Sequence, residues 1–184
     1  MACPLTISKF VGTVSLGLLT GVSYATSTIT IPSLKLLPSA GTASRSLNEV
    51  KRLSRKHAMR LSGVANGLLL FAYTLSPPRR KHPFLIWMVV FSSSSALATD
   101  YWFNRSLGFQ EWALETIRDT IGLSLGRASG RKDEDLVVVE AEEDINGEAV
   151  RLDMDREGRL QYVRSLIAGV AFSIGVVGLW GDRR

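Results

Sequence analysis

The chain has 184 residues, of which 46% are hydrophobic and 21% charged, and its formal net charge is +5 at pH 7. That length suits one ordinary domain or several membrane spans and is too short for two large domains. The single cysteine, Cys3, excludes an internal disulfide, and one cysteine with two histidines argues against a zinc site.

Charge is segregated along the chain. Four charge-free segments contain no Asp, Glu, Lys, Arg or His: residues 10–31, 61–76, 83–99 and 165–181. A water-soluble fold distributes charge along most of its helices, because each helix shows one face to water. A membrane span needs about 20 apolar residues, with about 17 as the lower limit. The pattern therefore predicts an all-α membrane protein with four transmembrane helices, and it disfavours the alternative of a soluble helical bundle.

The first region, 1–31, contains a short N-terminus and the first predicted transmembrane helix. Its flank carries one charge, Lys9. The tripeptide Ser23-Tyr24-Ala25 resembles the cleavage site of a secretory signal, which is the alternative interpretation. The apolar run continues past Ala25 to Ile31, so the favoured interpretation is a transmembrane helix that is not cleaved.

Region 32–60 is basic, with seven Lys or Arg residues and one acid, Glu49. Apolar residues recur at helical spacing from Ser46 to Arg60, which predicts a basic amphipathic helix leading into the second transmembrane helix, 58–76. Such a helix could lie on anionic headgroups of the lipid bilayer. RNA binding is disfavoured, because aromatic residues that would stack on bases are not interleaved with the basic ones.

Residues 77–82 (PPRRKH) predict a tight basic turn, because two prolines followed by charges cannot continue a helix. The second span and the third, 83–99, should therefore form a hairpin. The serines Ser92 to Ser95 are expected on a side of the third helix that faces protein and not lipid.

Region 100–164 is the only sizeable polar region. Helical spacing predicts an interfacial helix over 110–121. The segment 133–148 is acidic and contains no basic residue, and we interpret its acids as a candidate surface for a partner protein. These acids are Asp133, Glu134, Asp135, Glu140, Glu142, Glu143, Asp144 and Glu148.

The dipeptide Asn146-Gly147 is typical of a hairpin turn. Residues 136–139 and 149–154 on either side of it could form a small β-hairpin. An isolated hairpin is marginal in water, so a flexible acidic loop is the equal alternative. The fourth span, 165–181, and a short tail, 182–184, complete the chain.

Four spans place both termini on one side of the membrane and the regions 32–60 and 100–164 on the other. The count of basic residues near the span ends modestly favours cytosolic loops. No charge-free segment contains an acid, base or histidine, so the sequence predicts no buried ionisable group in the spans, which argues against a pump or a haem site.

Small residues four positions apart predict close helix packing, within the chain or between copies in a homo-oligomer. The predicted packing residues are Gly17, Gly21, Gly63, Gly67, Ala171 and Gly175.

No catalytic, nucleotide-binding or metal-binding motif is found, so the sequence predicts neither an enzyme nor a cofactor. The residues from Asp153 resemble the start of a calcium-binding loop, but calcium binding is rejected because Arg164 occupies the position where a bidentate Glu is needed. Nucleic-acid binding is likewise not expected.

Three pieces of the sequence together resemble a known family: ACPLTISKFVGTVSLGLLTGVSYATSTI, RRKHPFLIW and VVGLWGD. In this order and spacing they are similar to the fungal autophagy-related protein 33 family. The resemblance covers roughly half the chain. It implies a small four-span protein of the mitochondrial outer membrane that promotes mitophagy, the selective autophagy of mitochondria. The residues that carry its short motifs are Lys81, His82, Pro83, Phe84, Gly181 and Asp182.

A mitophagy receptor usually presents an aromatic residue, two spacers and then Leu, Ile or Val, which docks as an added strand on the autophagy modifier. Of the fifteen aromatic residues, only Trp87 has such a partner, Val90, and both lie inside the third span. We therefore expect this chain not to use the standard motif. We expect it to act upstream, as an adaptor or regulator that meets the autophagy machinery through the acidic loop.

Two alternative functions remain open at this stage. One is a small four-span membrane enzyme resembling the fungal oxygenases of aromatic polyketides, although only Asn66, Tyr73 and hydroxyl residues are available in the spans for chemistry. The other is a scaffold that shapes the membrane through its small-residue helix faces and the basic helix.

Overall fold

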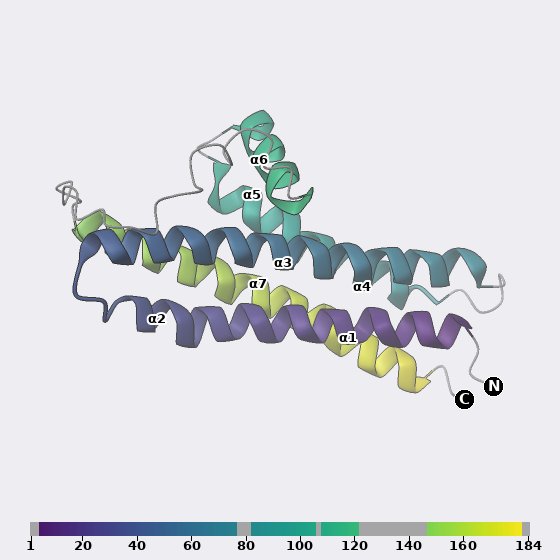
Figure 1. Cartoon of the computed structure of the whole chain (residues 1–184). Helices are drawn as coiled ribbons and strands as arrows, with labels where there is room; N and C mark the ends of the chain where they lie inside the picture. The colour runs from purple at the N-terminus through teal and green to yellow at the C-terminus, as the bar shows by residue number, and fades with distance from the viewer. Residues whose placement is uncertain (1–3, 77–81, 106–107, 122–146, 182–184) are drawn as a thin grey trace, which may run out of the picture.

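The computed structural model describes residues 4–76, 82–105, 108–121 and 147–181 (Figure 1). Every regular element in these ranges is a helix, which confirms the all-α prediction. Four helices are long and apolar enough to cross a membrane. These are Pro4–Leu34, Ala40–Leu75, Phe84–Phe103 and Gly147–Gly181.

The first long helix consists of α1 (Pro4–Ala25), a π-helical turn η1 (Thr26–Thr30) and α2 (Ile31–Leu34). Its many Ser and Thr residues do not disturb it, because their hydroxyls donate to carbonyls one turn back. Thr13 donates to the Lys9 carbonyl at 2.9 Å, and Thr26 to that of Val22 at 2.8 Å. Side chains satisfied in this way are compatible with apolar surroundings.

The second long helix, α3, spans Ala40–Leu75 without a break. Ser39 caps it, since the Ser39 hydroxyl accepts from the backbone N–H of Thr42 at 3.2 Å. The predicted basic amphipathic helix and the second charge-free segment are thus one continuous helix, about 54 Å long at 1.5 Å per residue.

Part of the basic region pairs within the molecule and not with an external surface. Lys51 Nζ lies 2.8 Å from an Asp153 carboxylate oxygen, and Lys35 Nζ lies 2.5 Å from one of Asp155. The Lys51 pair links α3, and the Lys35 pair links the end of α2, to the amino-terminal half of α7 (Gly147–Gly181).

The third long helix consists of α4 (Phe84–Ser93), a π-helical turn η3 (Ser94–Ala98) and α5 (Thr99–Phe103). Of the four serines predicted to face protein, Ser92 and Ser95 are fully buried, and Ser93 and Ser94 are half-buried. Ser92 shares a hydrogen bond with Ser62 of α3, with their hydroxyl oxygens 3.0 Å apart.

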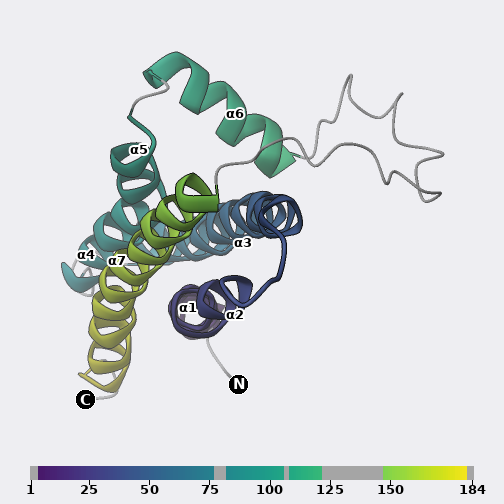
Figure 2. The same cartoon turned by 90° about the vertical axis from the view of Figure 1, so that its left-hand side faces the viewer.

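A separate helix, α6 (Phe109–Ile121), follows Gly108, whose φ of 80° lies in the left-handed region that favours glycine. It occupies the region where the sequence predicted an interfacial helix. Figure 2, which looks along the bundle, shows α6 lengthwise, so α6 runs across the bundle axis.

The predicted β-hairpin is wrong where it can be compared. Residues 149–154, its second strand, lie in α7, and residues 136–139, its first strand, lie outside the described residues. The physical reason is that the apolar side chains Val150 and Met154 are four residues apart and both are buried against α2 and α3. Helical spacing thus decided the structure of this segment, not the Asn-Gly turn signal.

The four long helices form an antiparallel up-down bundle (Figures 1 and 2). Helix α1 packs along α3 and α7, and α4 packs along the same two helices. Pro4 and Gly181 lie at one end, which we call the terminal end. The α2–α3 connection and the start of α7 lie at the other, which we call the loop end.

Apolar contacts differ between the two ends. At the terminal end the core contains Leu16, Leu69 and Met88, all fully buried, and the outward side chains there are also apolar, with Phe10 and Val177 exposed. Exposed apolar residues on every side are typical of a surface that contacts lipid.

A second apolar cluster gives the loop end its own core. It contains Ile31, Ala43, Leu47, Val150 and Met154. The bundle therefore continues as a packed helical structure beyond the charge-free segments.

Candidate functional site: a buried polar layer and a basic cleft

Arg164 is the largest fully buried side chain in the described part of the chain, with 1% of its surface exposed. Its guanidinium is bonded on three sides. It donates to an Asp100 carboxylate oxygen at 3.1 Å, to the Ser95 carbonyl at 3.2 Å and to the Gln161 side-chain oxygen at 3.3 Å. The positive charge that the apolar bundle encloses is thereby compensated.

Asp100 lies in α5 and is also buried, at 2% exposure. Besides Arg164, its carboxylate binds the guanidinium of Arg55 from α3 at 3.4 Å. It also accepts a hydrogen bond from the indole N–H of Trp112 at 2.8 Å. One carboxylate therefore connects four helices: α3, α5, α6 and α7.

The network continues along α7. The Gln161 amide donates to a Glu157 carboxylate oxygen at 2.7 Å and to the Ser54 hydroxyl at 2.5 Å. We call this network the buried polar layer; its members are Ser54, Arg55, Ser95, Asp100, Trp112, Glu157, Gln161 and Arg164. It separates the apolar contacts around Leu19 and Ala168 from those of the loop end.

The four charge-free segments hold no ionisable residue, but the bundle buries three charged residues that lie just outside them. Asp100 and Arg164 immediately follow and precede charge-free segments, but the helices run on without interruption, so both residues are enclosed by the bundle. Lys9, at the other end of α1, is also buried, at 6% exposure. In the sequence, the one indication that Arg164 and Asp100 could meet is that each flanks a predicted span on the same side of the membrane. Because they lie 64 positions apart in the sequence, only the fold could reveal that they pair.

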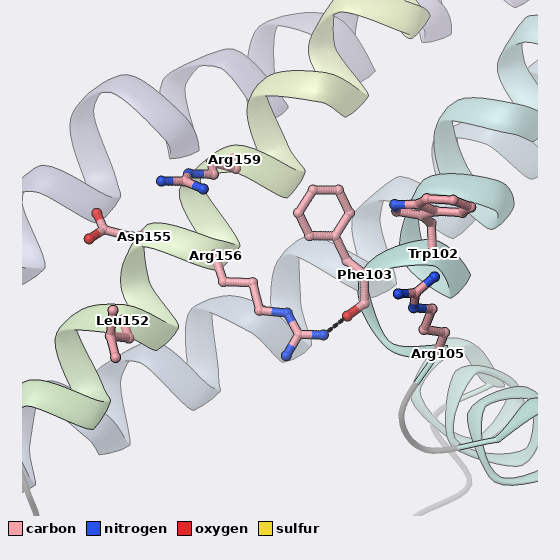
Figure 3. Close-up of a pocket in the computed structure, with 7 residues that line it drawn as sticks. All are labelled: Trp102, Phe103, Arg105, Leu152, Asp155, Arg156 and Arg159. Carbon is pink, nitrogen blue, oxygen red and sulfur yellow. Dashed lines mark hydrogen bonds between the residues drawn. The ribbon is translucent and has the colours of Figure 1, made fainter.

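Beside the layer, a cleft of about 350 Å³ opens between the end of α5 and the amino-terminal half of α7 (Figure 3). We call it the basic cleft. Arg105, Arg156 and Arg159 line it together with Trp102, Phe103, Leu152 and Asp155. No pattern in the sequence points to this site, because its arginines come from segments about 50 residues apart.

Two contacts give the basic cleft its shape. The Arg156 guanidinium donates to the Phe103 carbonyl (Figure 3) and so joins the two walls. The Arg105 guanidinium lies over the Trp102 ring, 5.3 Å from its centroid.

The predicted packing residues divide into two groups. Gly17, Ala171 and Gly175 lie at helix contacts. A Cβ on Gly17 would lie 3.0 Å from the Phe172 ring, Ala171 is fully buried, and a Cβ on Gly175 would lie 2.5 Å from Met88 Cε. By contrast, a Cβ on Gly21, Gly63 or Gly67 would meet no described atom within 4 Å.

Replacing both Gly63 and Gly67 with leucine is therefore expected to leave the stability of the monomer unchanged. If this open face packs copies together, as predicted for a homo-oligomer, chemical crosslinking in membranes should yield several-fold less dimer. Equal dimer yields for the double variant and the native chain would contradict a role of this face in association.

The family-motif residues that the structure describes gather at the terminal end. The His82 and Phe84 rings are 5.9 Å apart, and the Phe84 ring also lies 5.8 Å from Lys9 Nζ. Phe84 packs closely against Gly178, three residues before Gly181. The motifs of the third and fourth spans thus meet at one place. Lys81 and Asp182 lie outside the described residues.

The candidate partner surface also lies outside the described residues, from Asp133 to Asp144. The structure does describe both of its flanks, since α6 ends at Ile121 and α7 begins at Gly147. Among the described residues, no group of three His, Cys, Asp or Glu side chains could hold a metal ion.

Comparison with known proteins identifies the family. The family model described as autophagy-related protein 33 matches residues 1–156. The chain is 33% identical over 183 residues to autophagy-related protein 33 of Gibberella zeae, in an alignment that covers 95% of this chain and 89% of that protein. No solved structure matches this chain. A family model that covers most of the chain, together with a full-length relative, shows that this chain belongs to the autophagy-related protein 33 family.

Proposed function

We propose that this chain is a non-enzymatic integral protein of the mitochondrial outer membrane that promotes mitophagy as an adaptor or regulator. Its family membership carries an autophagy-related role. Four helices long and apolar enough to cross a bilayer support insertion in a membrane. The location in the mitochondrial outer membrane and the role in autophagy of mitochondria in particular are both proposed here.

The bundle is longer than a bilayer is thick, and this is the observation that carries the adaptor role. Helices α3 and α7 contain 36 and 35 residues, or about 54 and 52 Å at 1.5 Å per residue. The hydrocarbon core of a bilayer is about 30 Å thick. If the charge-free segments span it, the loop end projects more than about 15 Å beyond the hydrocarbon.

The projecting end is suited to hold a partner-binding segment. It has its own apolar core around Leu47 and Met154 and is tied together by the Lys35–Asp155 and Lys51–Asp153 pairs. Of the two flanks of the acidic segment, the start of α7 belongs to this end, and α6 attaches at the buried polar layer through the Trp112–Asp100 hydrogen bond. A partner bound to the acidic residues would thus be brought to the side of the bundle that projects beyond the hydrocarbon.

Neutralising the candidate partner surface tests this role. The seven acids from Asp133 to Asp144 are replaced by Asn or Gln, and delivery of a mitochondrial matrix reporter to the vacuole is measured during starvation. We expect several-fold less delivery, with normal amounts of protein on mitochondria. A matched control shuffles the order of residues 133–144 and keeps their charge. Native delivery by the neutralised variant would refute the acidic surface as the partner site.

Protease treatment of isolated mitochondria tests location and orientation. With a tag after Arg184, we expect cleavage within 122–146 on intact mitochondria and protection of the tag until the outer membrane is ruptured. Cleavage of the tag with protection of 122–146 would invert the topology and move the search for partners to the termini. Absence of the protein from mitochondria would remove the proposed address.

A further inference from the structure

We propose that the basic cleft binds the phosphate of an anionic phospholipid headgroup. This inference rests on one part of the proposed function, insertion of the bundle in a membrane. It does not depend on the autophagy partner or on the choice of organelle.

The charge of the cleft is the first argument. Arg105, Arg156 and Arg159 approach it from two segments, and the structure records no salt bridge for any of the three within the described residues. The one acid of the lining, Asp155, binds the Lys35 ammonium at 2.5 Å, and the hydrogen bond and charge of Lys35 and, to a smaller extent, the charge of Arg159 lower the pKa of its carboxyl. The cleft therefore carries an excess of positive charge that an anion would compensate.

The depth of the cleft is the second argument. Arg105 and Arg159 each lie about 14 residues from the midpoints of their charge-free segments, Phe91 and Ser173, which corresponds to about 21 Å at 1.5 Å per residue. The headgroup layer of a bilayer extends from about 15 to about 20–22 Å from the midplane. Arg159 in α7 and Arg105, two residues after the end of α5, thus both lie near the depth of the lipid phosphates.

The remaining walls fit a lipid better than a free anion. Trp102 is 65% exposed and lies about 16 Å from the same midplane, where aromatic residues anchor proteins at the membrane interface. Phe103 and Leu152 add apolar surface beside the charges. A phosphate between guanidiniums, with a glycerol backbone against aromatic and aliphatic side chains, uses both kinds of lining.

The arginines have separate tasks. The Arg156 guanidinium donates a hydrogen bond to the Phe103 carbonyl and so connects the two walls of the cleft (Figure 3). We therefore treat Arg156 as a positioning residue. Figure 3 shows Arg105 and Arg159 on opposite sides of Arg156. Their exposed guanidiniums are the groups that we assign to the phosphate, in the planar geometry that arginine offers to phosphate oxygens.

The test uses full-length protein purified in mild detergent with equal amounts of phosphatidylglycerol and phosphatidylcholine, and native mass spectrometry to count retained lipids. We expect the native chain to retain phosphatidylglycerol preferentially. The variant Arg105→Ala/Arg159→Ala should lose about fivefold of this preference for each arginine removed. Arg105→Gln/Arg159→Gln, which keeps most of the aliphatic stems, should show the same loss.

The matched control is Arg45→Ala/Arg151→Ala, which removes the same charge from two exposed positions outside the cleft. We expect it to keep the native preference. Equal preference in the native chain and both cleft variants would overturn the assignment. So would displacement of phosphatidylglycerol by an equal concentration of inorganic phosphate, because the cleft would then be a site for free phosphate.

Carbonate extraction of cell membranes separates the two proposals. Release of the native chain by carbonate would overturn the membrane insertion of the proposed function. A carbonate-resistant chain without preference for phosphatidylglycerol would overturn the cleft assignment alone.

Discussion

Replacing Arg164 with alanine is expected to lower the free energy of unfolding by about 3–5 kcal/mol, because it leaves part of a buried polar network without its cation. Asp100 would keep Arg55 at 3.4 Å, but the Ser95 carbonyl and the Gln161 side chain would each lose a donor. A chain of this size loses about 2–4 °C of melting temperature per kcal/mol. The midpoint temperature of thermal unfolding, measured in detergent, should therefore fall by roughly 6–20 °C.

Two comparisons make this expectation specific. Arg151→Ala removes an exposed arginine from the same helix and should change the midpoint little. Arg164→Met combined with Asp100→Leu removes both charges and should lose at least as much stability as Arg164→Ala, because the Arg55 guanidinium and the Trp112 indole N–H also lose the Asp100 carboxylate. A midpoint for Arg164→Ala equal to that of Arg151→Ala would show that the layer contributes nothing to stability.

Replacing Gly175 with leucine is expected to have the second large effect. A Cβ at this position would lie 2.5 Å from Met88 Cε and 2.9 Å from Thr13, so α7 could no longer approach both α4 and α1. Met88 is fully buried, and the Thr13 hydroxyl is bonded to the Lys9 carbonyl. Overpacking of a buried contact costs about 1–3 kcal/mol, or occasionally more, and we expect a fall of about 3–10 °C in melting temperature.

The chain offers a matched control for this variant. Gly63→Leu makes the same chemical change in α3, where a Cβ meets no described atom within 4 Å. Its melting temperature should stay near the native value. Equal falls for Gly175→Leu and Gly63→Leu would point to a general effect of leucine in these helices and would contradict the packing described for Gly175.

Both predictions concern how four helices are held at a fixed register. Close packing at Gly175 fixes the terminal end, and the carboxylate of Asp100 fixes the level where α3, α5, α6 and α7 meet. The adaptor role that we propose requires such rigidity, because the helices on either side of the acidic segment would have to keep their positions when a partner binds. Loss of either contact should thus reduce delivery of the mitochondrial matrix reporter to the vacuole, even if the acidic residues are intact.

The helical content and the number of apolar helices followed from local pattern. A charge-free run of about 17 residues or more can be recognised without its neighbours, because a bilayer imposes its length and composition on each span separately. Helical spacing likewise located α6 and the basic half of α3. The Asn146-Gly147 signal misled because a turn dipeptide has little weight against apolar side chains that bury at helical spacing, as Val150 and Met154 do.

What the sequence by itself determined about this protein was thus its class, its apolar helices and, through short motifs, its family. The tertiary structure alone decided which polar residues meet. Asp100 and Arg164, like Arg105 and Arg159, are distant in sequence, and each looked like an ordinary charge at a helix end. Their pairing and clustering depend on the antiparallel order of the helices and on how far each helix continues past its apolar segment. Those are properties of the packed bundle, because contacts between distant segments leave no periodic signal in the sequence of either one.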